Sequence, residues 1–202
     1  MPVVSRPPPR QGILARLARQ LLRYDTELFR TCYKGDTVKA AKLIEKGANV
    51  NFRYKGEYLC INTAMRCGHG ETVKLLVEKG ASINEYANYF DYRGGPQLDT
   101  YHGARLICLA VKCGELKTLK LLLERDAEVN HGPPKQGEDY WRHHDLDLLT
   151  AVIGRGNLEV INLLLSYGAD VTGSGSNIPL MSAVHSFRYG IVALLIENGV
   201  NV

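Results

Sequence analysis

The stretch CGHGETVKLLVEKGASIN, residues 67–84, decides the fold of this chain. Gly68 and Gly80 bracket a segment whose leucines and valines recur at three- and four-residue spacing, which is typical of an amphipathic helix. Glycine is favoured where a helix ends in a left-handed residue, because it has no Cβ to clash. The stretch therefore predicts a helix with a tight turn at each end.

The same pattern recurs along the whole chain. The other copies are KGDTVKAAKLIEKGANVN (34–51), CGELKTLKLLLERDAEVN (113–130), RGNLEVINLLLSYGADVT (155–172) and SFRYGIVALLIENGVNV (186–202). A shorter apolar segment precedes each copy, as in LCINTAMR, LICLAVK and PLMSAVH, and its spacing predicts a short helix. One such helix pair cannot bury its apolar face alone, so the units must stack on their neighbours.

The repeat resembles the ankyrin family over residues 25–202. Gly35 and Gly68 are separated by the 33-residue ankyrin period, and GASIN (80–84), GADV (168–171) and Pro179-Leu180 match the family motifs. The resemblance implies an all-α ankyrin-repeat solenoid of stacked helix-turn-helix units with β-turn fingers. The implied repeats are 25–54, 55–99, 100–142, 143–174 and 175–202.

The chain also departs from the family pattern. Leu59–Asn62 and Arg105–Cys108 replace the Thr-Pro-Leu-His motif, so we expect an array less stable than an idealised one. Asp126 and Phe187 occupy positions where glycine ends the helix in other copies. Aspartate tolerates the left-handed conformation better than most residues, whereas at Phe187 we expect a re-formed junction.

Two loops are enlarged by insertions. Against the 33-residue period, EYANYFDYRGGPQLDTYHG (85–103) and HGPPKQGEDYWRHHD (131–145) contain the extra residues. Insertions in repeat proteins map to loops on one face, often the binding face, and aromatic side chains are enriched at interfaces. Two interpretations stay open: the rings bind a partner, or they fold back on the array. The candidate partner-binding residues here are Tyr86, Tyr89, Phe90, Tyr92, Arg93, Tyr101, Tyr140, Trp141 and Arg142.

The resemblance implies further contact positions at the ends of the short helices, on the concave face. They are Tyr33, Lys34, Tyr58, Arg66, Cys67, Lys112, Cys113 and Arg155. Their cations form a basic row, which predicts a protein or peptide partner of acidic character. The alternative is that these cations only complement the dipoles of the helix ends.

The asparagines at the hairpin position carry a separate prediction. Asn51, Asn84 and Asn130 resemble the sites that asparaginyl hydroxylase modifies in ankyrin proteins, each with a leucine eight residues earlier. The resemblance implies a substrate relationship and not an activity of this chain.

The chain offers no catalytic constellation, so we expect no enzyme activity, no cofactor and no metal. His143-His144-Asp145 is the most metal-like cluster, and we interpret it as a polar loop. Residues 25–202 are close to neutral, which argues against nucleic-acid binding, and no apolar run approaches the roughly 20 residues that span a bilayer. An odd number of cysteines in apolar segments indicates reduced thiols and a cytoplasmic or nuclear protein.

We therefore expect a non-enzymatic protein-protein interaction module or scaffold, either monomeric or part of a longer chain. The alternative is a regulatory or substrate-recognition region of a larger enzyme, such as a kinase or ubiquitin ligase, or a microbial effector. Since the sequence ends within a repeat motif at Val202, we expect a following unit.

The N-terminal segment has its own composition. Residues 1–12 are rich in proline and arginine and predict a flexible segment, and residues 13–24 predict an amphipathic helix with Ile13, Leu17 and Leu21 on one side. Residues 1–24 carry five arginines and no acid. Three interpretations stay open: a cap on the first repeat, a membrane-surface or transit-like helix, and a partner-binding helix. We expect no membrane partner for the chain as a whole.

Overall fold

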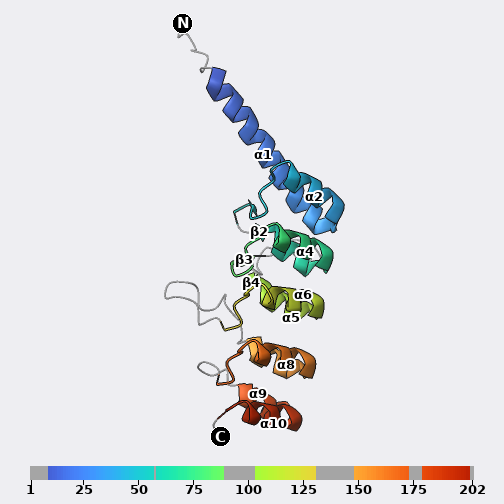
Figure 1. The fold of residues 1–202 in the computed structure, drawn as a ribbon, viewed down its shortest axis with the longest axis vertical. Helices are drawn as coiled ribbons and strands as arrows, with labels where there is room; N and C mark the ends of the chain where they lie inside the picture. Colours follow the sequence, from blue (N-terminus) through green and yellow to red (C-terminus); the bar gives the residue numbers. More distant parts are fainter. Residues whose placement is uncertain (1–8, 57, 89–102, 131–147, 173–178, 201–202) are drawn as a thin grey trace.

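A computed structural model of the chain describes residues 9–56, 58–88, 103–130, 148–172 and 179–200. The predicted all-α solenoid is confirmed, because helices follow one another in pairs along this part of the chain (Figure 1). The helices are α1 (Pro9–Lys34), α2 (Thr37–Glu45), α3 (Cys60–Arg66), α4 (Gly70–Glu78), α5 (Leu106–Cys113), α6 (Leu116–Leu123), α7 (Leu148–Arg155), α8 (Leu158–Ser166), α9 (Pro179–His185) and α10 (Tyr189–Glu197).

The helix pairs form a linear pile in which α1, α3, α5, α7 and α9 pack one on the next. In the second row, α2 packs on α4 and α4 on α6. One leucine position of the second row is buried in every repeat, and its occupants are Leu43, Leu76, Leu122, Leu164 and Leu195. Each buried leucine stabilises the fold by about 1.5–3 kcal/mol relative to an exposed one, so this position contributes to the core of every unit.

The turns between the helices of a pair share one geometry, although the residue at the turn varies. Gly68 has a φ of 78°, and the next N–H, from His69, donates to the carbonyl of Ala64 at 2.9 Å. Phe187 has a φ of 54° at the equivalent position, and Arg188 N donates to Ala183 O at 2.9 Å. The junction is therefore conserved and not re-formed as expected. The expected left-handed conformation of Asp126 is confirmed, with a φ of 59°.

At two of these turns a side chain also lies close to the glycine. A Cβ placed on Gly35 would lie 2.5 Å from the His69 ring, and one on Gly156 would lie 1.8 Å from Nη1 of Arg188. In both cases a side chain from the following repeat passes directly over the turn. The sequence alone indicates the helix ends but not this close approach.

A small sheet connects the fingers of the first three repeats. The strands β1 (Arg53–Tyr54), β2 (Tyr58–Leu59), β3 (Tyr86–Asn88) and β4 (Gly103–Arg105) lie in that order. β1 pairs antiparallel with β2, β2 parallel with β3, and β3 antiparallel with β4 in the register Tyr86↔Arg105. The base of the first enlarged loop is therefore a β-hairpin, whereas 89–102 and the second loop, 131–147, lie outside the described residues.

A ladder of asparagine side chains joins each finger to the next repeat. Asn84 Nδ2 donates to the carbonyl of Asp126 at 3.2 Å, and its Oδ1 accepts from the N–H of Glu128 at 2.9 Å. One side-chain amide thus satisfies a helix-end carbonyl and a loop N–H of the next unit. The same two bonds are made by Asn51 with Gly80 and Ser82, and by Asn130 with Gly168 and Asp170.

The ladder begins on α1 with a different residue. Asp25 Oδ1 accepts from the N–H of Asn49 at 2.7 Å, which is the bond that the asparagines make in later repeats. At the other end, Thr172 replaces the asparagine and bonds locally to Asp170. The ladder therefore runs from Asp25 to Asn130.

Helix α1 corrects the predicted division of the N-terminus. A flexible segment over 1–12 and a separate helix over 13–24 were expected, but α1 is one continuous helix from Pro9 to Lys34. The reason is local, because neither glycine nor proline interrupts the chain between Gly12 and Gly35 and most residues there favour helix. Proline at Pro9 suits the first turn, where no backbone N–H bond is needed.

The first part of α1 does not cap the array. Residues 14–23, termed here the α1 arm, extend beyond α2 and away from the pile (Figure 1). Leu14 is 66% exposed and Leu17 51% exposed, whereas Leu28, further along the same helix, is fully buried. The arm meets the array near Leu21, whose Cδ2 would lie 3.4 Å from a Cβ on Gly47.

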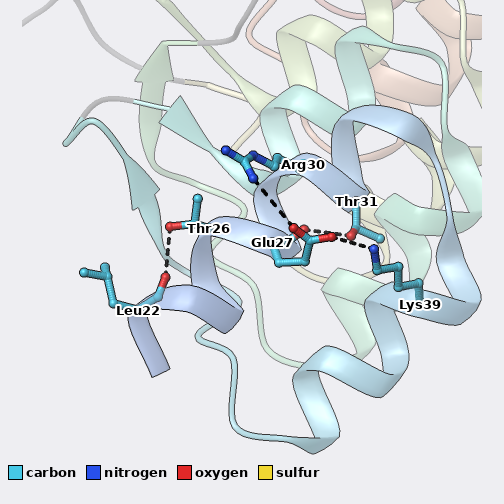
Figure 2. A network of polar contacts seen from close by, with 6 residues as sticks. All are labelled: Leu22, Thr26, Glu27, Arg30, Thr31 and Lys39. Carbon is cyan, nitrogen blue, oxygen red and sulfur yellow. Dashed lines mark hydrogen bonds and ion pairs between the residues drawn. The ribbon is translucent and has the colours of Figure 1, made fainter. Parts of the chain in front are cut away.

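A polar network holds α1 just beyond the point where the arm leaves the array (Figure 2). Glu27 accepts a hydrogen bond from Lys39 of α2 and lies 3.9 Å from Nη1 of Arg30. The Thr31 hydroxyl donates to the Glu27 carbonyl at 2.7 Å. The hydrogen bond from Lys39, and then the charges of Lys39, Arg30 and Lys34, hold the pKa of Glu27 below its ordinary value against a smaller opposing effect of burial.

Replacing Asn84 with alanine should destabilise the array by about 1–3 kcal/mol, because a helix-end carbonyl and a loop N–H lose their partner. Chemical denaturation of the whole chain measures this change. Asn162→Ala, at an exposed position of α8, is the matched control and should have a much smaller effect. Equal unfolding midpoints for the two variants would contradict the ladder's role.

Gly156→Ala and Gly154→Ala compare a glycine at a turn with a glycine inside a helix. Gly156→Ala should destabilise by at least about 1–2 kcal/mol, since it forces a left-handed alanine and displaces Arg188. Gly154 lies within α7 with open space around its Cβ position, so alanine there should be neutral or stabilising by up to about 1 kcal/mol. Thermal unfolding of the pair gives the comparison, and equal losses would contradict the demand for glycine at this turn.

Glu27 should contribute to the pH dependence of stability. Because its pKa is lower in the folded chain, its contribution is fully present above the unfolded value, about 4.3, and is lost as the pH falls through the folded value. Glu27→Gln should therefore lose less stability than wild type on acidification below about pH 4.5. Unfolding free energies at several pH values measure this, with Glu45→Gln on α2 as the control. Parallel curves for wild type and Glu27→Gln would contradict it.

Candidate functional site

The C-terminal ends of three successive helices of the first row, α3, α5 and α7, surround an open hollow of about 360 Å³. Three of the four cations in the predicted basic row line it, namely Arg66, Lys112 and Arg155. The fourth, Lys34, ends α1 and is exposed, and it is not among the lining residues. The structure thus brings together residues that lie far apart in the sequence. The other lining residues are Cys67, Gly68, Leu109, Cys113 and Glu115.

Arg155 has a structural contact with the preceding repeat. Arg155 Nη1 donates to the carbonyl of Val111, near the end of α5, at 2.7 Å. His69 Nε2 donates in the same way to the carbonyl of Tyr33, and Arg188 Nη2 to that of Gly154. Side chains of one repeat therefore complete the last turn of a short helix in the preceding repeat, where carbonyls lack helical partners.

The hollow is electropositive in spite of these contacts. Three cations face one carboxylate, Glu115, and Lys112 and Arg155 are exposed. The helix-dipole interpretation holds for Arg155, whose charge lies against a helix C-terminus. That bond uses one of the five N–H donors of the guanidinium, so Arg155 is positioned by its contact and can still donate to a ligand.

Two thiols lie in the same hollow. Cys67 follows α3 and Cys113 ends α5, and both are half-buried. The other thiols, Cys32, Cys60 and Cys108, are buried in the core. A hydrogen bond with Cys32, together with burial, raises the pKa of Cys60, so that this thiol stays protonated. Core packing accounts for these three, whereas Cys67 and Cys113 add soft apolar surface to the hollow.

The aromatic candidates that the structure describes have structural roles. Tyr58 lies in β2, and its half-buried side chain packs against the core. Tyr33 is half-buried, and its carbonyl accepts from His69. Tyr86 is described only as a backbone position of β3. The remaining loop candidates lie outside the described residues, and they are Tyr89, Phe90, Tyr92, Arg93, Tyr101, Tyr140, Trp141 and Arg142.

The predicted hydroxylation sites coincide with the asparagine ladder. The amides of Asn51, Asn84 and Asn130 each hold two backbone groups of the following repeat. Their common position in the repeat was visible in the sequence, but its structural purpose was not. An enzyme that required an extended substrate would have to open the ladder locally.

Neighbouring finger residues also form ion pairs. Arg53 of β1 pairs with Glu85, just before β3, and Arg105 Nη1 lies 2.7 Å from Glu128 Oε2. A hydrogen bond from Ser82, followed by the contact with Arg53, lowers the pKa of Glu85. These pairs join fingers of adjacent repeats and are partly exposed, so each contributes about 1 kcal/mol or less.

In the described part of the chain, no three His, Cys, Asp or Glu residues are grouped closely enough to hold a metal ion. His143, His144 and Asp145 lie outside it. Among the described helices, none has the length and apolar character needed to cross a bilayer.

The stacked helix pairs, the left-handed turns and the fingers are those of ankyrin repeats. A family model for three copies of the ankyrin repeat matches residues 28–133, just over half of the chain. The chain therefore belongs to the ankyrin-repeat family. Ankyrin repeats are generally protein-protein interaction modules and typically non-enzymatic. No curated protein matches the sequence.

Proposed function

We propose that the chain is a non-enzymatic interaction module that binds an acidic, extended segment of a partner protein in the hollow between α3, α5 and α7. The observation that carries the proposal is the convergence of Arg66, Lys112 and Arg155 from three successive repeats on one open hollow. The membership of the ankyrin family supports the binding class. The cations that line the hollow support an acidic ligand.

The repeat spacing also suggests the spacing of the ligand's charges. Helices packed in a row lie about 8–10 Å apart, and a segment in the extended polyproline II conformation advances about 3.1 Å per residue with every third side chain on the same side. A segment that crosses the row would therefore pass a new cation about every third residue. We propose a ligand in which acidic residues recur at about this interval.

The strength of such binding depends on salt and on burial. A hydrogen bond to a charged group contributes about 1.5–3 kcal/mol, whereas a solvent-exposed ion pair contributes about 1 kcal/mol or less. Arg66 is half-buried, so a hydrogen bond to it should contribute near the larger of these values. Lys112 is exposed, so an ion pair with it should contribute near the smaller one. Glu115 at the rim disfavours ligands whose acidic residues are continuous.

We also propose a cellular compartment and an assembly state for the chain. The five cysteines are thiols, which supports a reducing compartment, and we propose the cytoplasm or the nucleus. We propose that the chain acts as a monomer or as part of a longer protein.

The decisive experiment measures the affinity of synthetic peptides by fluorescence polarisation at several salt concentrations. A peptide with glutamate at every third position should bind more tightly than a permuted peptide of the same composition. Lys112→Glu should weaken binding by about tenfold, or about 1.4 kcal/mol, and flatten its salt dependence. Lys117→Glu makes the same charge change at an exposed position of α6 and is the matched control.

The combined variant Arg66→Glu/Lys112→Glu should abolish measurable binding. If this variant bound the spaced peptide as well as wild type at every salt concentration, the hollow would not be the binding site. The variant Tyr89→Ala/Tyr92→Ala/Trp141→Ala tests the enlarged loops in the same assay. Loss of binding only in this variant would place the contact on the loops and not in the hollow.

A further inference from the structure

The α1 arm has an apolar face that no neighbouring repeat covers. Four leucines of the arm are 43–66% exposed, and they are Leu14, Leu17, Leu21 and Leu22. The stripe formed by Leu14, Leu17 and Leu21 continues along the same helix into Tyr24, which is half-buried, and Leu28, which is fully buried. The array therefore covers the second half of one continuous stripe and leaves the first half exposed.

The opposite face of the arm is basic. At 3.6 residues per turn, the leucines and alanines of residues 14–22 occupy an arc of about 160°, and Arg16, Arg19 and Arg23 lie within about 60° on the other side. These arginines are exposed. The first acidic residue of α1 is Asp25, which is already bonded to Asn49 of the array. The arm thus has one apolar half and one purely cationic half.

We propose that the α1 arm is a membrane-contact site that lies on an anionic lipid surface, with its leucines among the acyl chains and its arginines at the headgroups. This reverses the expectation of no membrane partner. A broad apolar arc opposite a basic face is the pattern of helices that lie in a membrane interface. Anionic headgroups supply the negative charge that the arm itself lacks, and long arginine side chains reach headgroups from a partly buried helix.

A second copy of the chain fits the arm less well. Two arms packed through their leucines would cover the apolar face only, and the arginines on the opposite face would find no carboxylate from residues 9–24 to pair with. A protein groove typically takes a narrow stripe at helical spacing, whereas the apolar arc of the arm is nearly half of the helix surface. A membrane surface offers acyl chains to the apolar half of the arm and anionic headgroups to its cationic half, so it matches both faces at once.

The geometry of α1 also suits this role. The arm is rigidly continuous with the helix that packs against α2 and α3, and the Glu27–Lys39 contact fixes its base. It projects away from the pile (Figure 1), and its leucines are exposed. The hollow between α3, α5 and α7 takes no part in this contact.

The test is co-sedimentation of the full chain with phosphatidylcholine vesicles, with and without phosphatidylserine. Wild type should sediment with the phosphatidylserine vesicles and about tenfold more weakly with the neutral ones. Leu14→Gln/Leu17→Gln should weaken binding by at least about tenfold, because two apolar side chains leave the acyl region. Arg16→Gln/Arg19→Gln/Arg23→Gln should remove the preference for the anionic lipid.

Two control variants make the same kinds of substitution, apolar to glutamine and cation to glutamine, at exposed positions of the array. Val38→Gln/Leu158→Gln replaces exposed apolar residues of the array, and Lys42→Gln/Lys74→Gln/Lys117→Gln removes three exposed charges. Both should bind vesicles like wild type, and circular dichroism verifies that each variant is folded.

Three results would overturn the proposal. The first is no sedimentation of wild type above the vesicle-free background. The second is unchanged binding by Leu14→Gln/Leu17→Gln. The third is a concentration-dependent dimer in light scattering that this variant abolishes, which would identify a second copy as the occupant.

Discussion

Each helix pair in this chain can bury its apolar face only against the pair next to it. The leucine position that runs from Leu43 to Leu195 is buried in every repeat because a neighbour covers it. Stability in such a pile is a sum of local interfaces, and no central core compensates for a weak junction. The α1 arm shows what happens without a neighbour, because the same helical stripe becomes exposed. An exposed face at this point is a consequence of the architecture, and it leaves room for another partner.

Apolar contact alone does not fix how far one pair is displaced along the next. Directional bonds along the pile supply that register. The asparagine ladder joins each finger to the following one, as when Asn84 holds both Asp126 and Glu128. Near the short-helix ends, Arg155 and His69 reach back to carbonyls of the preceding repeat. Because these bonds end on backbone groups, neighbouring side chains can vary between copies without loss of register.

The repeat and the helix ends could be predicted from the sequence, because each depends on local periodicity. Features that depend on contacts between repeats could not. The family resemblance implied Arg66, Lys112 and Arg155 as contact positions but gave no hollow and did not indicate Glu115. The junction at Phe187 was expected to change, yet the bond from Arg188 to Ala183 keeps the turn. The predicted division of the N-terminus into segments 1–12 and 13–24 was wrong, because the residue composition changes along this stretch but the preference for helix does not.

One of the register bonds also positions a cation of the proposed binding site. A cation that reaches back to a preceding carbonyl must end in the seam between two repeats, as Arg155 does at Val111. Its charge is only partly neutralised there, since a helix C-terminus carries about half of an elementary charge. Arg188 does the same at Gly154, so two successive seams each contain a positioned arginine. A ligand that crosses several seams adds contacts between units that otherwise meet only their neighbours, so binding should stiffen the pile as a whole. In the proposed complex, Arg155 would then serve both recognition and register.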